Sequence, residues 1–190
     1  MLIKTSDIVV STPQAFEEEP ENSPFNHDVT QGYLNYGLYS RRTIFFHAFY
    51  KAYDLESFKG NIRNAQILAD ILTNLIRYFI PDPSFWTIIT TPQRAHTEKL
   101  GYHFASEVLK ITARDTGIQF IQEVIGARNK NKIMPEFHQL KPIPDTSKLI
   151  LFDDILTTGK TIYTTIDVLR NNTDNHLKTN PLIIVGINNN

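Results

Sequence analysis

The most regular pattern in the chain is a helical repeat of apolar residues over positions 61–80, which Pro81 and Pro83 bring to an end. Similar spacing predicts a second helix over residues 97–113 and a third that begins at Ile162. Within each segment one face is apolar, so each helix is expected to pack on a core. The apolar positions of the three helices are Ile62, Ala65, Leu68, Ile71, Leu72, Leu75, Ile76 and Phe79, then Leu100, Phe104, Val108, Leu109 and Ile111, then Ile162, Ile166, Val168 and Leu169.

Short apolar runs at residues 86–90, 118–125, 149–152 and 182–187 alternate with these helices. Strands that are apolar throughout are typical of a parallel sheet covered on both faces. The alternation therefore predicts an α/β fold built on a doubly wound parallel sheet. Ligands of such sheets bind beyond the C-terminal ends of the strands, where the strand order reverses. The loops that follow the first three runs are expected to meet at one site.

The rest of the chain is predicted to be less regular. Residues 1–32 are interpreted as an N-terminal arm or loop, and residues 33–190 as one domain. Aromatic residues are frequent at positions 33–53, which predicts a small lid or hood packed against the core, with an aromatic cage for a base as the alternative. Residues 127–145 are polar and interrupted by prolines, so a long loop is expected there.

Composition narrows the class of protein. The chain has 190 residues, of which 41% are hydrophobic and 21% charged, as in a soluble globular domain. The net charge of −1 provides no overall field to attract nucleic acid or a membrane surface. The absence of cysteine excludes disulfides, Cys-ligated zinc, iron–sulfur clusters and thiol nucleophiles, and it fits a cytoplasmic protein. No apolar run approaches the ~20 residues of a membrane span, and we expect no signal peptide.

The candidate chemistry follows the apolar run at residues 149–152. Two adjacent carboxylates, Asp153 and Asp154, come directly after it, and a glycine-containing loop rich in hydroxyl groups leads into the third helix. A helix N-terminus offers unpaired N–H groups and a partial positive charge to a phosphate, while carboxylates suit ribose hydroxyls or Mg²⁺. The pattern therefore predicts a site for a phosphorylated sugar. Its loop residues are Thr157, Thr158, Gly159, Lys160 and Thr161.

Two other interpretations of this run are open. A P-loop also ends in Gly-Lys-Thr, but Asp154 stands where its first glycine belongs, and a carboxylate there would repel a triphosphate. The run is also compatible with an ordinary strand, turn and helix that serve only the fold, with a threonine as the helix cap. The six histidines do not organise a metal site, because His96 and His103 have no third ligand at metal spacing.

The run resembles the phosphoribosyl pyrophosphate signature of type I phosphoribosyltransferases, in which an apolar strand, two acids and two variable residues precede Thr-Thr-Gly-x-Thr. The resemblance implies the fold of that family, with Asp153 and Asp154 as the catalytic pair that holds the ribose hydroxyls, directly or through Mg²⁺ and water. Thr157 occupies the position of an Asp in enzymes that use 6-oxopurines, which argues against hypoxanthine and guanine. The implied binding loop for ribose 5-phosphate comprises Ile155, Leu156, Thr157, Thr158, Gly159, Lys160 and Thr161.

Phosphoribosyl transfer also needs cationic or N–H groups around the departing pyrophosphate. Thr91 and Arg94 follow the strand predicted at residues 86–90, and a backbone anion nest with a bidentate arginine is expected there. Arg128 opens a basic stretch in the long loop and is a further candidate, because closure of that loop would exclude water. The alternatives are a surface arginine in a turn and a solvated basic loop.

Within the family, the chain resembles the ComF-like branch, whose members are linked to DNA uptake in competent bacteria. Pro92, Arg94, the Gly101-Tyr102 pair and Arg128 carry this resemblance, which covers roughly residues 40–187. Leu100 and His103 depart from the pattern of the branch, and its four-cysteine zinc module is absent.

The favoured function is therefore transfer of phosphoribosyl from phosphoribosyl pyrophosphate to a nitrogenous base or amine, with Mg²⁺ as the cofactor and pyrophosphate as the leaving group. One alternative is a non-catalytic protein that senses nucleotide or supports DNA uptake, for which nucleic acid would be a partner. Another is a phosphoesterase or nucleoside hydrolase with water as the acceptor. The family resemblance also implies a homodimer.

Overall fold

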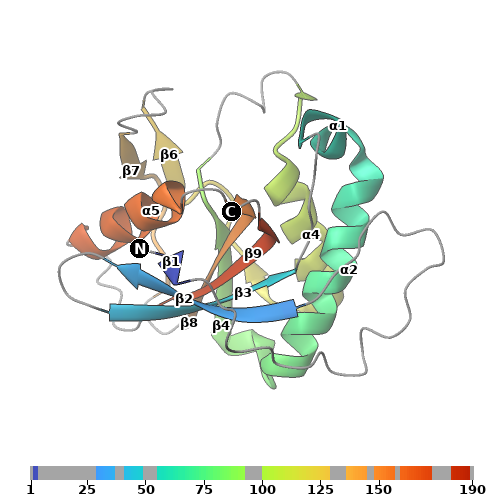
Figure 1. The fold of residues 1–190 in the computed structure, drawn as a ribbon, viewed down its shortest axis with the longest axis horizontal. Helices are drawn as coiled ribbons and strands as arrows, with labels where there is room; N and C mark the ends of the chain where they lie inside the picture. Colours follow the sequence, from blue (N-terminus) through green and yellow to red (C-terminus); the bar gives the residue numbers. More distant parts are fainter. Residues whose placement is uncertain are drawn as a thin grey trace.

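The computed structural model describes residues 2–3, 29–36, 41–48, 55–92, 100–128, 136–144, 148–156, 159–172 and 181–188. These residues form a seven-stranded sheet with helices on both faces, and a separate two-stranded sheet (Figure 1). The predicted α/β class is confirmed. No helix in the described part of the chain is long and apolar enough to cross a membrane.

The large sheet has the strand order β1-β2-β3-β9-β8-β4-β5. Strands β9, β8, β4 and β5 are parallel to one another, as predicted. Strand β3, whose residues were predicted to form a lid, is parallel to β9, and β2 runs antiparallel to both β1 and β3. The strands are β1 (Leu2–Ile3), β2 (Val29–Tyr36), β3 (Arg41–Ala48), β4 (Trp86–Thr90), β5 (Gln119–Phe120), β8 (Lys148–Leu156) and β9 (Leu182–Asn188).

The helices are largely those that the apolar spacing predicts. Asn61 caps the longest one, and its side-chain oxygen accepts a hydrogen bond from the backbone N–H of Arg63 over 3.1 Å. The helix predicted over residues 97–113 is confirmed from Phe104 onwards, but it is not continuous before that residue, because Gly101 has a left-handed φ of +73°. The helices are α1 (Leu55–Gly60), α2 (Ile62–Phe79), the 3₁₀ turn η3 (Pro83–Phe85), α4 (Phe104–Thr116) and α5 (Lys160–Asn171).

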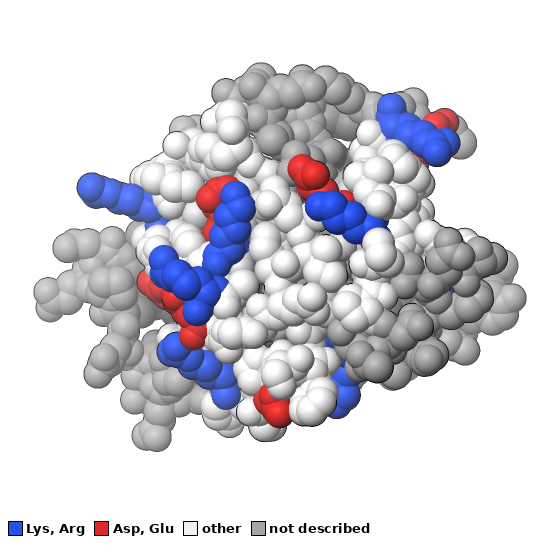
Figure 2. Space-filling model, turned by 180° about the vertical axis from the view of Figure 1, so that it is seen from behind, with Lys and Arg blue, Asp and Glu red and all other residues white. Residues whose placement is uncertain are grey.

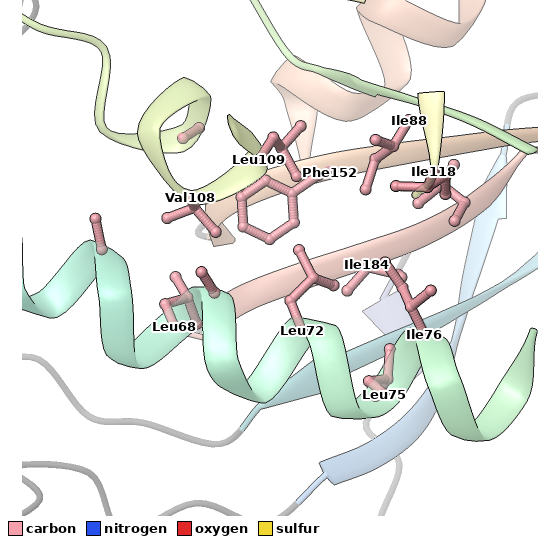
Figure 3. Close-up of a cluster of buried hydrophobic side chains, with 14 of the residues drawn as sticks. Leu68, Leu72, Leu75, Ile76, Ile88, Val108, Leu109, Ile118, Phe152 and Ile184 are labelled. Atoms are coloured by element: carbon pink, nitrogen blue, oxygen red, sulfur yellow. The ribbon is translucent and has the colours of Figure 1, made fainter. Parts of the chain in front are cut away.

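Two apolar layers hold the helices on the sheet. Helices α2 and α4 cover one face, where Leu72, Leu109 and Phe152 meet in the core shown in Figure 3. Helix α5 covers the other face through Ile162, which packs with residues such as Leu151. Neighbouring residues of β8 thus face opposite layers, and this explains why that part of the strand is apolar at every position.

The strand predicted over residues 118–125 is only partly correct. The sheet keeps β5 at residues 119–120, and a turn with Glu123 at a positive φ of 59° then redirects the chain. Strand β6 (Ile125–Ala127) pairs with β7 (Phe137–Gln139) in the two-stranded sheet. The predicted loop over residues 127–145 therefore contains a strand that the sequence did not indicate.

The aromatic-rich segment contributes to the large sheet. Of the residues predicted as a lid, 33–36 belong to β2 and 41–48 are β3, which pairs with β9. The suggested division between residues 32 and 33 falls inside β2. Most of the predicted N-terminal arm, residues 4–28, lies outside the described residues.

The chain connections create a switch point between β4 and β8. From β4 the chain passes through α4 to β5 on one side, and from β8 it passes through α5 to β9 on the other. Because β4 and β8 are neighbours, the two connections diverge from adjacent C-terminal ends. This is where open α/β sheets bind their ligands.

Candidate functional site

The acid pair lies inside strand β8. Asp153 and Asp154 are 8% and 7% exposed, and the strand continues through Leu156. The prediction that the strand ends before the acids, and that Ile155 and Leu156 open the loop, is wrong. Strand β9 is long enough to pair with β8 up to Asn188, so the ladder extends past the carboxylates.

Asp153 is joined to the end of the neighbouring strand. The hydroxyl group of Thr91 donates a hydrogen bond to Oδ1 of Asp153 over 2.9 Å, and the backbone N–H of Thr91 donates to the carbonyl oxygen of Phe152 over 3.1 Å. Thr91 is itself only 5% exposed. The structure therefore brings Thr91 to the acid pair, with its hydroxyl hydrogen directed to a carboxylate.

Asp154 forms an ion pair that the sequence analysis missed. Oδ2 of Asp154 lies 2.6 Å from Nζ of Lys59, which comes from the last turn of α1. Both side chains are largely buried, with 10% and 17% of their surface exposed. No motif surrounds Lys59, so nothing in the local sequence signals this contact.

A histidine and a tyrosine next to α4 complete this side of the site. The Tyr102 hydroxyl donates to the carbonyl oxygen of Lys59, and Nδ1 of His103 lies 2.8 Å from the hydroxyl oxygen of Ser106. Burial lowers the pKa of His103 below its ordinary value of 6.5, and the positive charge of Lys59 acts in the same direction, whereas Asp154 opposes the shift. The site therefore presents a neutral imidazole near an ion pair.

The loop after β8 leads into α5 through Gly159. This residue has a φ of +73°, and its carbonyl oxygen accepts the hydrogen bond from the N–H of Tyr163 over 3.0 Å. A Cβ at Gly159 would lie 3.2 Å from the Tyr163 ring. Both the positive φ and this close approach therefore favour glycine at the position. Lys160 and Thr161, which were predicted to belong to the loop, are the first two residues of α5, so the helix begins before Ile162. Thr157 and Thr158 lie outside the described residues.

Two of the three predicted pyrophosphate contacts, Thr91 and Arg128, belong to the described residues. Thr91 is at the acid pair, and Arg94 lies outside the described residues. Arg128 is exposed at the end of β6, where its backbone N–H donates to the carbonyl oxygen of Glu136 over 2.8 Å and closes the small hairpin. The hairpin adjoins α5, since the Asn172 amide donates to Gln139 over 2.8 Å.

The residues at the end of β8 fit a magnesium ion only in part. Within the described ranges, no group of three or more His, Asp or Glu side chains is arranged to hold a metal. Asp153 and Asp154 are engaged by Thr91 and Lys59 respectively. Mg²⁺ usually retains water and takes one or two carboxylates together with phosphate oxygens of the substrate. The acid pair suits that mode of binding and does not form a closed protein cage.

Charge on the surface is mixed. Figure 2 shows Lys and Arg side chains next to Asp and Glu in several places, with a broad uncharged area between them. Among the described residues of that face, the basic side chains do not join into one patch. This view therefore gives no support to a nucleic-acid surface.

No family model and no curated protein matches the chain. Among solved structures, an adenine phosphoribosyltransferase from Leishmania tarentolae is 16% identical, with a TM-score of 0.39 over 72% of this chain and 76% of its own. A purine phosphoribosyltransferase from Pyrococcus horikoshii OT3 is 11% identical, with a TM-score of 0.40 over 74% and 87%. The adenine phosphoribosyltransferase from Leishmania donovani is 14% identical, with a TM-score of 0.38 over 71% and 69%. Likeness at this level fixes neither a family nor a substrate.

Proposed function

We propose that this protein binds phosphoribosyl pyrophosphate with Mg²⁺ and transfers the phosphoribosyl group to a nitrogenous base or an amine, releasing pyrophosphate. The observation that carries the proposal is the position of the acid pair. Asp153 and Asp154 lie at the switch point of the sheet, beside the end of β4 and a few residues before Gly159 and α5. Open α/β sheets bind their ligands at the switch point, so this position of the acids supports the proposal.

The roles proposed for the residues follow from their chemistry. The carboxylates of Asp153 and Asp154 accept hydrogen bonds from the two ribose hydroxyls. Backbone N–H groups at the start of α5, together with the loop of residues 157–161, bind the 5′-phosphate. Gly159 allows the backbone to approach this phosphate closely. In this arrangement the acid pair binds the ribose hydroxyls, and the loop and helix that follow it bind the 5′-phosphate.

The transfer itself requires mainly geometry and charge. The bond from C1′ to the pyrophosphate oxygen breaks, the bond from C1′ to the acceptor nitrogen forms, and the acceptor loses a proton. Mg²⁺ would neutralise charge that develops on the pyrophosphate. Arg94 and Arg128 are proposed to act on the same group from the protein. Thr91 is not proposed as a donor to it, because its hydroxyl donates to Asp153 and its backbone N–H donates to the carbonyl oxygen of Phe152. Rigid placement of the ribose next to the acceptor lowers the entropic part of the barrier.

Calorimetric titration of phosphoribosyl pyrophosphate, with and without Mg²⁺, tests the proposal. We expect Mg²⁺-dependent binding, followed by pyrophosphate release when a suitable base or amine is added. The Asp153→Asn/Asp154→Asn variant should lose this binding, whereas Asp70→Asn, a change at an exposed residue of α2, should not. Absence of binding by the unaltered protein would refute the proposal. Binding without pyrophosphate release from any base or amine would favour a non-catalytic sensor.

A further inference from the structure

We infer that Lys59 is a ligand-contacting residue of this site and that its ammonium group binds the pyrophosphate of the phosphoribosyl ligand. The inference rests on the proposed function and adds a residue that lies outside the signature. It starts from the 2.6 Å contact between Nζ of Lys59 and Oδ2 of Asp154, which places a cation directly at the acid pair.

The backbone on both sides of the Lys59 side chain is fixed by hydrogen bonds. The buried amide of Asn64 donates to the carbonyl oxygen of Phe58 over 2.8 Å, and the Tyr102 hydroxyl donates to the carbonyl oxygen of Lys59 itself. The ring of Phe58 also packs against Phe104, with ring centroids 5.4 Å apart. Contacts from α2 and from the residues at the start of α4 thus hold the backbone of Lys59 in place. A lysine that only meets solvent would not need such contacts.

Lys59 makes the charge at the acid pair more favourable for an anionic ligand. Two adjacent carboxylates with little exposure would repel a phosphate group, and Lys59 offsets one of the two charges. An ammonium group carries three N–H donors. The contact with Asp154 uses one of them, so a phosphate oxygen can be bound by another without breaking the ion pair.

Lys59 and the start of α5 lie on opposite sides of the sheet, so we expect them to contact opposite ends of the ligand. Phe58, next to Lys59, packs in the layer beneath α2 and α4, whereas Ile162 near the start of α5 packs in the opposite layer. The acid pair on β8 lies between these layers. A ribose bound at the acids, with its 5′-phosphate at α5, directs its other charged group toward Lys59. In phosphoribosyl pyrophosphate that group is the pyrophosphate.

The test compares two ligands on the same variants. We would titrate phosphoribosyl pyrophosphate and ribose 5-phosphate, each with Mg²⁺, into the unaltered protein, Lys59→Met, Lys59→Arg and Lys110→Met. Lys110 is the control, because it also forms a 2.7 Å ion pair but is exposed on α4. Lys59→Met should weaken binding of phosphoribosyl pyrophosphate by roughly tenfold to a hundredfold and that of ribose 5-phosphate by less than about threefold. Lys59→Arg should recover much of the loss, and Lys110→Met should match the unaltered protein.

The possible outcomes separate this inference from the proposed function. If the unaltered protein binds phosphoribosyl pyrophosphate and Lys59→Met binds it equally well, Lys59 is not a ligand contact, although the proposed function stands. Equal losses for both ligands would also overturn the inference, because Lys59 would then act only through Asp154. If the unaltered protein binds neither ligand, both proposals fail.

A measurement on the unaltered protein covers the case in which Lys59→Met does not fold. Lysine-directed acylation, followed by mass spectrometry, reports the reactivity of each amine. Phosphoribosyl pyrophosphate with Mg²⁺ should reduce labelling of Lys59 more than ribose 5-phosphate does, and Lys110 should react equally in both. Labelling of Lys59 that neither ligand changes would contradict the inference.

Discussion

The hydroxyl group of Thr91 and the carboxylate of Asp153 form a 2.9 Å hydrogen bond between residues that are 62 positions apart in the chain. The bond links the end of β4 to the acid pair on β8, at the switch point of the sheet. It also fixes the orientation of one carboxylate without using a backbone group. The geometry of the acid pair therefore depends on a strand other than the one that carries it.

Replacing Thr91 by Val tests this dependence. The change keeps the shape of the side chain and the backbone N–H, but it removes the donor to Asp153. We expect the free energy of unfolding to fall by about 1–2 kcal/mol and the affinity for phosphoribosyl pyrophosphate to fall as well, as measured by urea unfolding and calorimetry. Thr112→Val is a matched control, because that buried hydroxyl bonds only the Val108 carbonyl within α4. Equal affinities for the two variants would argue against a role for the Thr91 hydroxyl.

The Lys59–Asp154 pair should show strong coupling in stability. Asp154→Asn leaves a buried ammonium group without its counter-charge, and Lys59→Met leaves a buried carboxylate, so each change is expected to destabilise the fold by about 3 kcal/mol. The double variant removes both charges, and its loss should be smaller than the sum of the two. A double-mutant cycle from urea unfolding measures this difference. Additive losses would show that the pair contributes little beyond the separate side chains.

Replacing Gly159 by Ala tests the loop before α5, and replacing Gly117 by Ala is its control. Both have a left-handed backbone, with φ values of +73° and +76°, so an alanine at either position should destabilise the fold by about 1–2 kcal/mol. Only at Gly159 would the new Cβ also crowd the Tyr163 ring. We expect Gly159→Ala alone to weaken binding of phosphoribosyl pyrophosphate in calorimetry. A similar loss of affinity in Gly117→Ala would mean that the effect is not local.

His103 should make stability depend on pH on the acidic side of neutrality. Because burial lowers its pKa below 6.5, the unfolded chain takes up a proton at a higher pH than the folded protein does. The free energy of unfolding should therefore fall as the pH drops below 6.5, until the folded protein is also protonated. His103→Gln should reduce this slope in urea unfolding followed from about pH 8 to about pH 5. An unchanged slope would show that other groups produce it.

The sequence was sufficient wherever one local pattern decided the structure. Helix α2 follows from an uninterrupted apolar repeat between an Asn cap and two prolines, and β4 has the predicted bounds. Helix α4 begins later than predicted, because apolar spacing alone does not show that Gly101 takes a left-handed backbone. A helix after the glycine-containing loop was also predicted correctly, although α5 begins at Lys160 and not at Ile162.

Features set by pairing between distant segments were not predictable. Strand β8 continues through the two acids because β9 offers it a partner of sufficient length, a fact that no property of the acids reveals. Strand β7 forms only against β6. Lys59 reaches Asp154 across the fold, so the acid pair could be located from sequence but its counter-charge could not.

The neighbours of β4 have a consequence for biosynthesis. During translation β4 is made before either partner, and residues 91–147 must be added before β8 begins to emerge from the ribosome. Until then the apolar edge of β4 has an unpaired row of N–H and C=O groups, which is a known hazard for aggregation in nascent chains. We therefore expect the newly made chain to depend on chaperones until β8 is complete, and the same event brings Thr91 and Asp153 together.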